Sequence, residues 1–190
     1  EQELKKPVSE LFTDFETEAF ASASMAQVHK ATLKTGEKVV LKIQRPGIKE
    51  MIFSDIKVML YVAAIFSKRM PSLKSFDPVG LVRSFEESIT KELDFIYESV
   101  SVQRFAHQFS TDESNHDHIH SPKVYPEFTT SKVLTLEFIN GIKISKIEVL
   151  KEKGYDCKII ARRLAVSYFK QIFDYGYFHA DPHPGNLLVL

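Results

Sequence analysis

The sequence has one cysteine, no net charge and no long apolar run, and each absence excludes a class of protein. The single cysteine, Cys157, excludes an internal disulfide and fits a reducing compartment. Lys and Arg total 25, and Asp and Glu also total 25, so the formal charge is zero. Because nucleic-acid backbones select proteins with a basic excess, nucleic acid is not an expected partner.

No stretch of the chain reaches the roughly 18 apolar residues that a membrane-spanning helix needs. The longest apolar run, Val58 to Phe66, is half that length. The chain also shows no signal-peptide pattern and no initiator Met, and we interpret it as a fragment of a longer protein. Its 190 residues, 44% of them hydrophobic, suit one domain or two small lobes.

The last stretch of the chain carries the clearest functional pattern. Asp181 and Asn186 lie five positions apart, with two prolines and a glycine between them, which predicts a stiff loop. The spacing Asp-x-x-x-x-Asn is that of the kinase catalytic loop, in which the Asp faces the acceptor hydroxyl and the Asn binds Mg²⁺. We expect an amphipathic helix over Cys157–Tyr175 before the loop and a strand over Leu187–Leu190 after it. The apolar stripe of that helix is Ile160, Leu164, Tyr168 and Ile172.

A segment near the start of the chain lacks the glycines that its pattern normally carries. Residues 21–31 follow the kinase nucleotide-loop pattern G-x-G-x-x-G-x-V-x-x-A, with alanine at each glycine position. Backbone amides can still face phosphates there, but positive φ costs more at alanine, so we expect a stiffer loop. The alternative is a plain strand turn built from small residues. The candidate phosphate-binding residues are Ala21, Ser22, Ala23, Ser24, Ala26 and Val28.

The next predicted strand, Lys38–Gln44, is apolar apart from one interior lysine, Lys42. A lysine is costly to bury unless it is paired, and Lys42 follows Val28 by 14 residues, close to the spacing of the phosphate-binding lysine of kinases. The alternative is a lysine on an exposed strand face. We expect its carboxylate partner to be Glu98, with Glu92 and Asp94 as the alternatives.

Helices are expected on both sides of this strand. The first is a short amphipathic helix over Glu3–Phe12. A second helix over Ile48–Lys68 has an apolar stripe that we interpret as core. Asp77 and Pro78 form a cap and an N1 proline, which predicts a third helix to about Gln108 with a bend. The stripe of the second helix is Ile52, Ile56, Met59, Leu60, Ala63 and Phe66.

The middle of the chain holds a predicted loop and a predicted hinge. Thr111–His120 is polar and we interpret it as a loop, with its alternating histidines, His116, His118 and His120, as a less favoured metal site. The strand Lys132–Phe138 is broken by Ile139–Gly141, as a kinase hinge strand would be. In that interpretation Leu136 lines the adenine pocket and Glu137 begins the hinge.

These motifs, in this order, resemble the UbiB/AarF/ADCK family of atypical kinases. The matching stretches are residues 20–31, Val40–Gly47, Lys91–Phe95 with Glu98, Leu136–Gly141 and Phe178–Asn186. The resemblance implies an α+β, protein-kinase-like, two-lobed fold. Residues 1–136 would form a small lobe with an antiparallel sheet, long helices and a family helical insert. Residues 137–190 would form the hinge and the start of a mostly helical large lobe.

The same resemblance implies Mg²⁺–ATP binding, ATPase activity and support of ubiquinone or related prenyl-lipid metabolism. Expected partners are quinone-pathway proteins and a membrane surface. The expected location is a bacterial cytoplasm with peripheral membrane contact, or a mitochondrial matrix. The family's upstream Lys-x-Gly-Gln and downstream Asp-Phe-Gly segments are not in this sequence. We expect the parent protein to carry both, and we do not expect this stretch alone to be a competent catalyst.

Roles for individual residues follow from the resemblance and the loop pattern together. Lys42, paired with Glu98, would position the α- and β-phosphates, while Asn186 would bind Mg²⁺ and Asp181 would orient the acceptor. The pair Glu92 and Asp94 looks like the family motif that helps hold an N-terminal extension across the active site. His183 would contact the γ-phosphate when protonated, and His179 would pack under the loop. Ala180 replaces the arginine through which phosphorylation controls many protein kinases, so we expect no such control.

Three other functions stay open at this point. The loop also resembles that of aminoglycoside and choline phosphotransferases, although the alanine loop favours the UbiB interpretation. A stiffened loop also suits a nucleotide-binding scaffold without turnover. The third alternative is a metallohydrolase whose ligands are His179, Asp181 and His183, which stand at i, i+2 and i+4.

Overall fold

The computed structural model describes residues 1–69, 76–112, 118–181 and 183–190. The strands in this part of the chain are β1 (Phe12–Phe15), β2 (Ala21–Ser22), β3 (Ala26–Leu33), β4 (Lys38–Gln44), β5 (Val133–Glu137), β6 (Ile142–Lys143) and β7 (Leu188–Val189). The helices are α1 (Val8–Leu11), α2 (Ile48–Arg69), α3 (Pro78–Glu92), α4 (Phe95–Ser110), α5 (Ile147–Glu152) and α6 (Cys157–Phe173), with 3₁₀ turns η2 (Pro126–Phe128) and η3 (Pro184–Asn186). The chain forms two compact units, Glu1–Val100 with Val124–Glu137, and Ser101–Lys123 with Phe138–Leu190.

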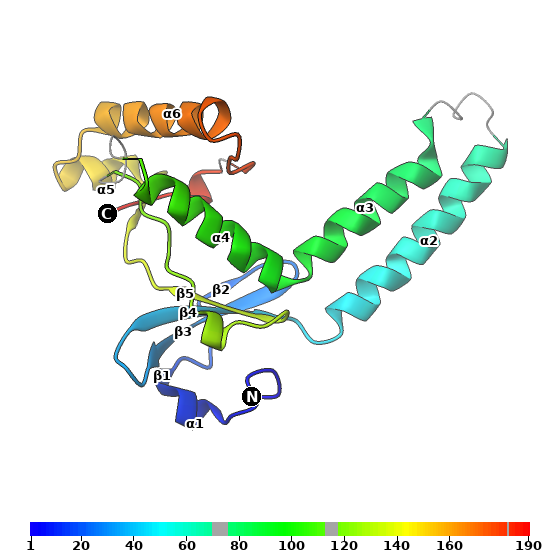
Figure 1. Cartoon of the computed structure of the whole chain (residues 1–190), viewed down its shortest axis with the longest axis horizontal. Helices are drawn as coiled ribbons and strands as arrows, with labels where there is room; N and C mark the ends of the chain where they lie inside the picture. The colour runs from blue at the N-terminus through cyan, green and yellow to red at the C-terminus, as the bar shows by residue number, and fades with distance from the viewer. Residues whose placement is uncertain (70–75, 113–117, 182) are drawn as a thin grey trace. The chain divides into compact units, whose positions relative to one another are not determined.

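The first unit contains an antiparallel sheet in the order β1-β3-β4-β5, with β2 paired to β3 (Figure 1). Strand β4 is central, and Lys42 lies opposite Val28 on β3 and opposite Leu134 on β5. Val39 and Leu41, which alternate with Lys42, are buried at 0% and 2% exposure. Because side chains alternate between the two faces of a strand, this core places Lys42 on the opposite face of the sheet.

The core on one face of the sheet explains why the start of the chain differs from the prediction. We expected one helix over Glu3–Phe12, but α1 covers only Val8–Leu11 and is followed by β1. Phe12 is buried in the cluster formed with Leu33 and Tyr125, and its backbone pairs with Leu33 on β3. A buried aromatic side chain suits a strand, and sheet pairing outweighed the helical pattern of a short segment.

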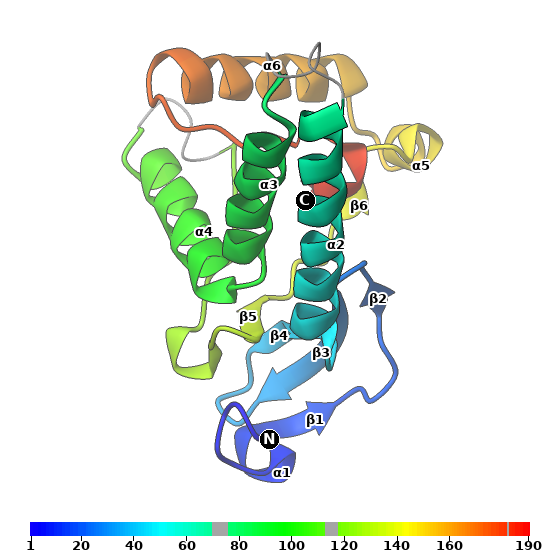
Figure 2. The same cartoon turned by 90° about the vertical axis from the view of Figure 1, so that its right-hand side faces the viewer.

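Helices α2 and α3 run side by side as an antiparallel pair (Figures 1 and 2). Ile56 and Ala63 of α2 pack on Val82 of α3, so the centre of the predicted stripe is core. Its edge is not core, because Met59 and Phe66 are 42% and 47% exposed. The interpretation of the whole stripe as core was therefore wrong at these two residues.

The predicted bend between Pro78 and Gln108 is a break between two capped helices. Asp77 caps α3, as predicted, by accepting a hydrogen bond from the Gly80 N–H at 3.1 Å. α3 ends at Glu92, and Asp94 accepts a hydrogen bond from the Ile96 N–H at 3.0 Å. An aspartate that binds an N–H of the first turn is a common helix start, so α4 begins anew at Phe95.

In the second unit, the end of α4 packs against the end of α6. The Asp112 carboxylate accepts hydrogen bonds from Lys170 Nζ, at 2.6 Å, and from the Tyr175 hydroxyl. Phe109, which is 2% exposed, meets the Tyr175 ring edge-on. These contacts group the C-terminal half of α4 with residues 138–190. The division of the chain into lobes at residue 136 stays a prediction.

The buried side of α6 includes three of the four residues of the predicted stripe, but its most buried residues are polar. Ser167 and Gln171 are each 2% exposed, whereas Ile172 of the predicted stripe is 46% exposed. The other stripe residues, Ile160, Leu164 and Tyr168, are half-buried. The packed face of this helix is therefore polar at its centre, where an apolar stripe was expected. None of the described helices is long and apolar enough to cross a membrane.

Replacing Asp156 with Ala should lower the free energy of unfolding by about 1 kcal/mol, because Asp156 caps α6. Its carboxylate accepts hydrogen bonds from the N–H groups of Lys158 and Ile159 at 2.7 and 3.4 Å. The control is Asp174→Ala at the other end of α6, where a carboxylate gains nothing from the helix dipole. Chemical denaturation of the full-length variants measures the free energy of unfolding of each. Equal losses of stability in the two variants would contradict the capping role.

Candidate active site

The ion pair predicted between Lys42 and Glu98 is present. Lys42 Nζ lies 2.7 Å from Glu98 Oε2 and 4.8 Å from the centroid of the Phe95 ring. The two side chains are 30% and 37% exposed, so the pair contributes only about 0–1 kcal/mol to stability. What the pair does is to fix the position of an ammonium group on the sheet face opposite the core.

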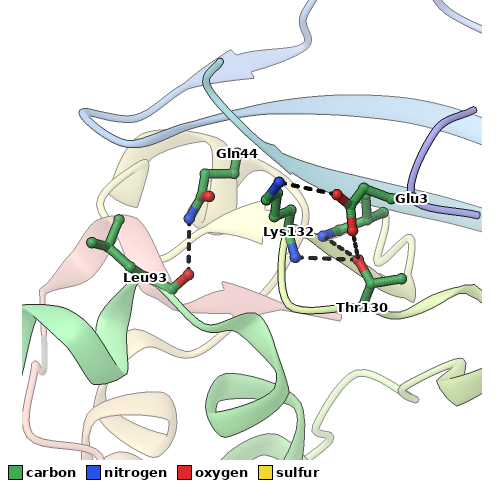
Figure 3. Close-up of polar contacts among 6 residues, drawn as sticks. Glu3, Gln44, Leu93, Thr130 and Lys132 are labelled. Carbon is green, nitrogen blue, oxygen red and sulfur yellow. Dashed lines mark hydrogen bonds and ion pairs between the residues drawn. The ribbon is translucent and has the colours of Figure 1, made fainter. Parts of the chain in front are cut away.

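A second strand residue, Gln44, joins β4 to the end of α3, just before α4 begins, as Figure 3 shows. Its Nε2 donates to the Leu93 carbonyl at 2.9 Å, and Gln44 is 8% exposed. The Phe95 N–H then donates to the Ser131 carbonyl at 3.0 Å. Glu98 lies one turn beyond Phe95, so these two bonds fix the position of Glu98 along α4 relative to Lys42. Sequence reasoning missed Gln44, although its position two residues after Lys42 places both on one face of the strand.

Figure 3 also shows how the start of the chain is held against the residues before β5. Glu3 accepts a hydrogen bond from the Thr130 hydroxyl at 3.2 Å and pairs with Lys132 Nζ at 3.2 Å. The Thr130 hydroxyl also accepts the N–H groups of Lys132 and Val133. Lys132 is next to Ser131, whose carbonyl accepts the Phe95 N–H at the start of α4. This network therefore supports the segment to which α4 is bonded.

The two motif carboxylates near Glu98 have different surroundings. Asp94 caps α4, as described above, and so has a structural contact of its own. Glu92 is exposed at the last residue of α3, where the helix dipole gives a carboxylate no stabilisation. Neither residue is the partner of Lys42. Their part in holding an N-terminal extension stays a prediction.

The alanine segment forms the turn of the β2–β3 hairpin, which the Ala23 N–H closes by donating to the Ala26 carbonyl at 2.9 Å. Ala26 is buried, and Val28 is half-buried. Among the described residues, only Lys5 and Asp77 combine a side chain with positive φ. The alanines therefore avoid the left-handed conformation, as expected from their extra Cβ. Ala21, Ser22, Ala23 and Ser24 are all exposed and line the turn.

Arg45 ties this turn to the end of β4, and sequence reasoning did not find it. Its N–H donates to the Met25 carbonyl at 2.9 Å, and its Nε donates to the Ala23 carbonyl at 3.3 Å. The far end of its guanidinium binds the Ser22 hydroxyl. The loop that would cover phosphates is thus fixed by a cationic side chain just beyond the strand of Lys42.

The hinge candidates lie at the end of β5. Leu136 pairs with Val40 of β4 and also forms a bridge with Val124, while Glu137 lies opposite Val39. Both side chains are half-buried. Strand β5 ends at Glu137, as a hinge strand would, and contact with adenine stays a prediction for both residues.

In the second unit, Asp181 and Asn186 face each other across the predicted loop. Asn186 Nδ2 donates to Asp181 Oδ2 at 2.8 Å, and both residues are exposed. His183 Nδ1 accepts a hydrogen bond from the Gly185 N–H at 3.0 Å, which leaves Nε2 as the donor of the neutral ring. The loop is therefore closed by its own side chains and presents two oxygen-bearing groups. Pro182 lies outside the described residues.

The prediction that His179 packs under the loop was wrong, because the residue is exposed, but its predicted bonding at the loop is present. Its N–H donates to Gln171 Oε1 at 3.0 Å, and its Nδ1 accepts from the Asp181 N–H at 3.2 Å. Burial, together with the nearby Asp181 carboxylate, raises the pKa of Tyr168 above its usual 10.0. Tyr168 therefore stays a neutral phenol near Asp181 at physiological pH.

The metallohydrolase alternative has no support in this geometry. The Nδ1 atoms of His179 and His183 each accept a backbone N–H and are unavailable to a metal. In the part of the chain that the structure describes, no group of three or more His, Cys, Asp or Glu residues is arranged to hold a metal. Of the histidines between Thr111 and His120, His116 lies outside the described residues.

A cavity of about 800 Å³ in the first unit is lined in part by residues of the contacts described above, Gln44, Leu93 and Lys132. It opens between α2, α3 and the end of β4, and charged side chains of both signs line it, among them Arg83, Glu87 and Lys91. Neither Lys42 nor Glu98 lines it. The cavity therefore adjoins the contacts that position Glu98 but does not include the Lys42–Glu98 ion pair.

The chain is similar to proteins already known. It matches the family described as "ABC1 atypical kinase-like domain" over residues 1–190. It is 40% identical over 190 residues to the "Probable protein kinase UbiB" of Vibrio vulnificus, covering all of this chain and 34% of that protein. It is 39% identical over 189 residues to "Protein ACTIVITY OF BC1 COMPLEX KINASE 7, chloroplastic" of Arabidopsis thaliana, covering all of this chain and 26% of that protein.

A solved structure shares the fold. The structure titled "The complex structure of Rv3197-erythromycin from Mycobacterium tuberculosis" matches with a TM-score of 0.80 and 29% identity, over 99% of this chain and 46% of that chain. The chain spans 26% to 34% of the length of the two curated relatives named above. The predicted α+β, kinase-like fold class is confirmed. With the family match over its whole length, the chain belongs to the ABC1 atypical kinase-like family.

Proposed function

We propose that the protein containing these residues is an atypical kinase or ATPase of the UbiB type that binds Mg²⁺–ATP. The observation that carries this proposal is the 2.7 Å ion pair between Lys42 and Glu98. A partly exposed pair adds little to stability, so its value lies in holding an ammonium group in one place. Kinases use such a lysine, held by a helix carboxylate, to bind the α- and β-phosphates.

The polar groups around the alanine turn support phosphate binding by the same unit. The exposed turn residues carry backbone amides, and Arg45 holds the turn through Ser22, Ala23 and Met25. A turn fixed before the ligand arrives loses less conformational entropy on binding. The side chains of Leu136 and Glu137 would then border the adenine.

The loop of the second unit has the donor set that Mg²⁺ prefers. Mg²⁺ binds carboxylate, carbonyl and phosphate oxygens. Asn186 Nδ2 faces Asp181, which leaves Asn186 Oδ1 as an oxygen ligand, and the Asp181 carboxylate is exposed. When bound, Mg²⁺ would neutralise charge on the phosphates. Asp181 would orient the acceptor hydroxyl or water, and the His183 Nε2–H would donate to a phosphate oxygen.

The acceptor and the setting of the reaction are further parts of the proposal. Family membership and the UbiB-type motifs support a role in ubiquinone or related prenyl-lipid metabolism, with quinone-pathway proteins and a membrane surface as partners. A small-molecule phosphotransferase shares the loop pattern, but nothing in the described geometry favours it. A nucleotide-binding scaffold is the second candidate, because Arg45 and the alanines restrict the turn that would cover the phosphates.

Binding of ATP to the full-length protein, measured by calorimetry with Mg²⁺ and with EDTA, tests this proposal. We expect Mg²⁺ to tighten binding. Asn186→Ala should weaken Mg²⁺-dependent binding by about tenfold, the equivalent of about 1.4 kcal/mol, because one oxygen ligand is lost. In EDTA the variant and the wild type should bind alike. A wild type that binds no nucleotide in either condition would overturn both the ATPase and the scaffold.

A further inference from the structure

The buried face of α6 carries a glutamine that none of the predicted roles uses. Gln171 and Ser167 lie one turn apart on α6, and each is 2% exposed. Long polar side chains are rarely this buried unless they are hydrogen-bonded. Both polar ends of the Gln171 amide have partners, so the residue is held in one orientation.

The orientation of the Gln171 amide follows from its partners. The His179 backbone N–H can only donate, so the amide atom that faces it at 3.0 Å must be the oxygen, Oε1. Nε2 then points the other way and donates to the Ser167 hydroxyl at 3.2 Å. The oxygen and nitrogen of the Gln171 amide are therefore assigned by the His179 backbone N–H, which can only donate a hydrogen bond.

Gln171 holds the segment before the loop at two points. Its side chain accepts the His179 N–H, and its backbone carbonyl accepts the Tyr177 N–H at 3.2 Å. Two bonds to alternate residues set both the position and the direction of the segment Tyr177–His179. The last turn of α6 therefore positions the segment of chain that leads into the loop.

From His179 the contacts continue to the two candidate catalytic residues. His179 Nδ1 accepts the Asp181 N–H at 3.2 Å, and Asp181 Oδ2 accepts from Asn186 Nδ2 at 2.8 Å. Asp181 also lies near the Tyr168 phenol, since its charge contributes to the raised pKa of that group. Tyr168 is three residues before Gln171, on the same side of α6.

We propose that Gln171 is a positioning residue for the catalytic loop, which acts through His179 to set where Asp181 points. Gln171 does not itself touch a substrate. Its effect on the reaction rests on the proposed function, whereas its hydrogen bond to His179 does not. The simpler explanation, that Gln171 only satisfies buried polar groups and stabilises the fold, makes different predictions in the two experiments below.

The first experiment is amide hydrogen exchange on the full-length protein, resolved to the segment around His179. In Gln171→Met, a change of similar size, the His179 N–H loses its acceptor and should exchange at least about tenfold faster. Ser167→Ala is the matched control, because it removes only the partner of Nε2 and should leave this exchange unchanged. Unchanged exchange in Gln171→Met would overturn the proposal without any reference to ATP.

The second experiment compares turnover and binding in the same variants. Misplacement of a catalytic group by about 1 Å costs on the order of 10²-fold in rate, so Gln171→Met should lower kcat by about 10- to 100-fold. The dissociation constant for Mg²⁺–ATP should change less than about twofold, because Gln171 touches none of the proposed nucleotide ligands. Gln171→Glu keeps an oxygen toward His179 and should recover most of the loss.

A double-mutant cycle separates positioning from general destabilisation. If Gln171 acts through Asp181, Gln171→Met should have no further effect on the residual turnover of Asp181→Asn. Additive losses in the double variant, or equal losses in kcat and in nucleotide affinity, would overturn the proposal. A wild type without turnover would instead overturn the proposed function, and the exchange result would still decide the hydrogen bond.

Discussion

Replacing Asp181 with Asn should lower ATP turnover by the full-length protein by about 10²- to 10⁴-fold, the usual contribution of a positioned general base. The Asp181 carboxylate is exposed at the surface of the loop and accepts one hydrogen bond from Asn186. An asparagine oxygen can accept that bond too, so the loop should keep its shape. What the change removes is the negative charge that, in the proposed function, would orient the acceptor.

Turnover should be measured at saturating Mg²⁺–ATP, so that a change in affinity does not enter the comparison. The control is Asp174→Asn, the same chemical change seven residues earlier at the exposed end of α6, and it should keep wild-type turnover. Binding of ATP should persist in both variants. If Asp181→Asn turned over ATP at the wild-type rate, Asp181 would have no catalytic role.

Replacing Lys42 with Ala should lower kcat/KM for ATP by about 10²- to 10³-fold, the range seen when one preorganised electrostatic contact is removed. The structure holds Lys42 Nζ at 2.7 Å from Glu98, and in the proposed function this ammonium would bind the α- and β-phosphates. The thermal stability should change little, because about a third of each side chain is exposed to water. A large kinetic effect with a small stability effect is what distinguishes a binding lysine from a structural one.

Lys38→Ala on the same strand is the matched control. Lys38 is exposed at the start of β4, four residues before Lys42, and should tolerate the change without kinetic effect. Glu98→Gln, which keeps the shape but weakens the hold on Lys42, should fall between the wild type and Lys42→Ala. Equal kcat/KM in Lys42→Ala and Lys38→Ala would remove the basis of the proposed nucleotide site.

The sequence predicted the parts of the site that follow from spacing along one element. Lys42 was found because a lone lysine interrupts an apolar strand, and Glu98 because apolar residues flank it at helical intervals. The sequence also placed Asp181 and Asn186 in one stiff loop that contains two prolines and a glycine, but it did not predict the hydrogen bond between them. The pairing of Lys42 with Glu98 joins residues 56 positions apart and came from the kinase pattern, and the ion pair is present.

The sequence did not predict the residues that hold these groups in place. Gln44, Arg45 and Gln171 are polar, and nothing in their neighbours distinguishes a buried glutamine or a bonded arginine from a solvated one. On α6 the apolar stripe identified the packed side at Ile160, Leu164 and Tyr168. It missed the two most buried residues, Ser167 and Gln171, and wrongly included Ile172. Which face is buried depends on residues distant in sequence, which a periodicity within one helix does not contain.

The same limit explains the two errors in the first unit. The predicted helix over Glu3–Phe12 began too early and ran one residue into β1, because apolar residues at 4, 8, 11 and 12 fit a helical face. The pairing of Phe12 with Leu33 on β3 is a distant contact that this pattern does not contain. On α2 the apolar stripe is wider than the surface that α3 covers, so Met59 and Phe66 are left exposed. Sequence patterns predicted which segments form helices and strands. Contacts between residues distant in sequence determined where those elements end and which sides of them are buried.

The most direct test of the central claim is ATP turnover by the complete protein with Mg²⁺, in the presence and absence of anionic liposomes. Asp181→Asn serves as the blank. We predict Mg²⁺-dependent turnover that increases with lipid and falls to the blank level in the variant. Tight nucleotide binding without turnover in any condition would contradict the enzymatic account and favour a nucleotide-binding scaffold.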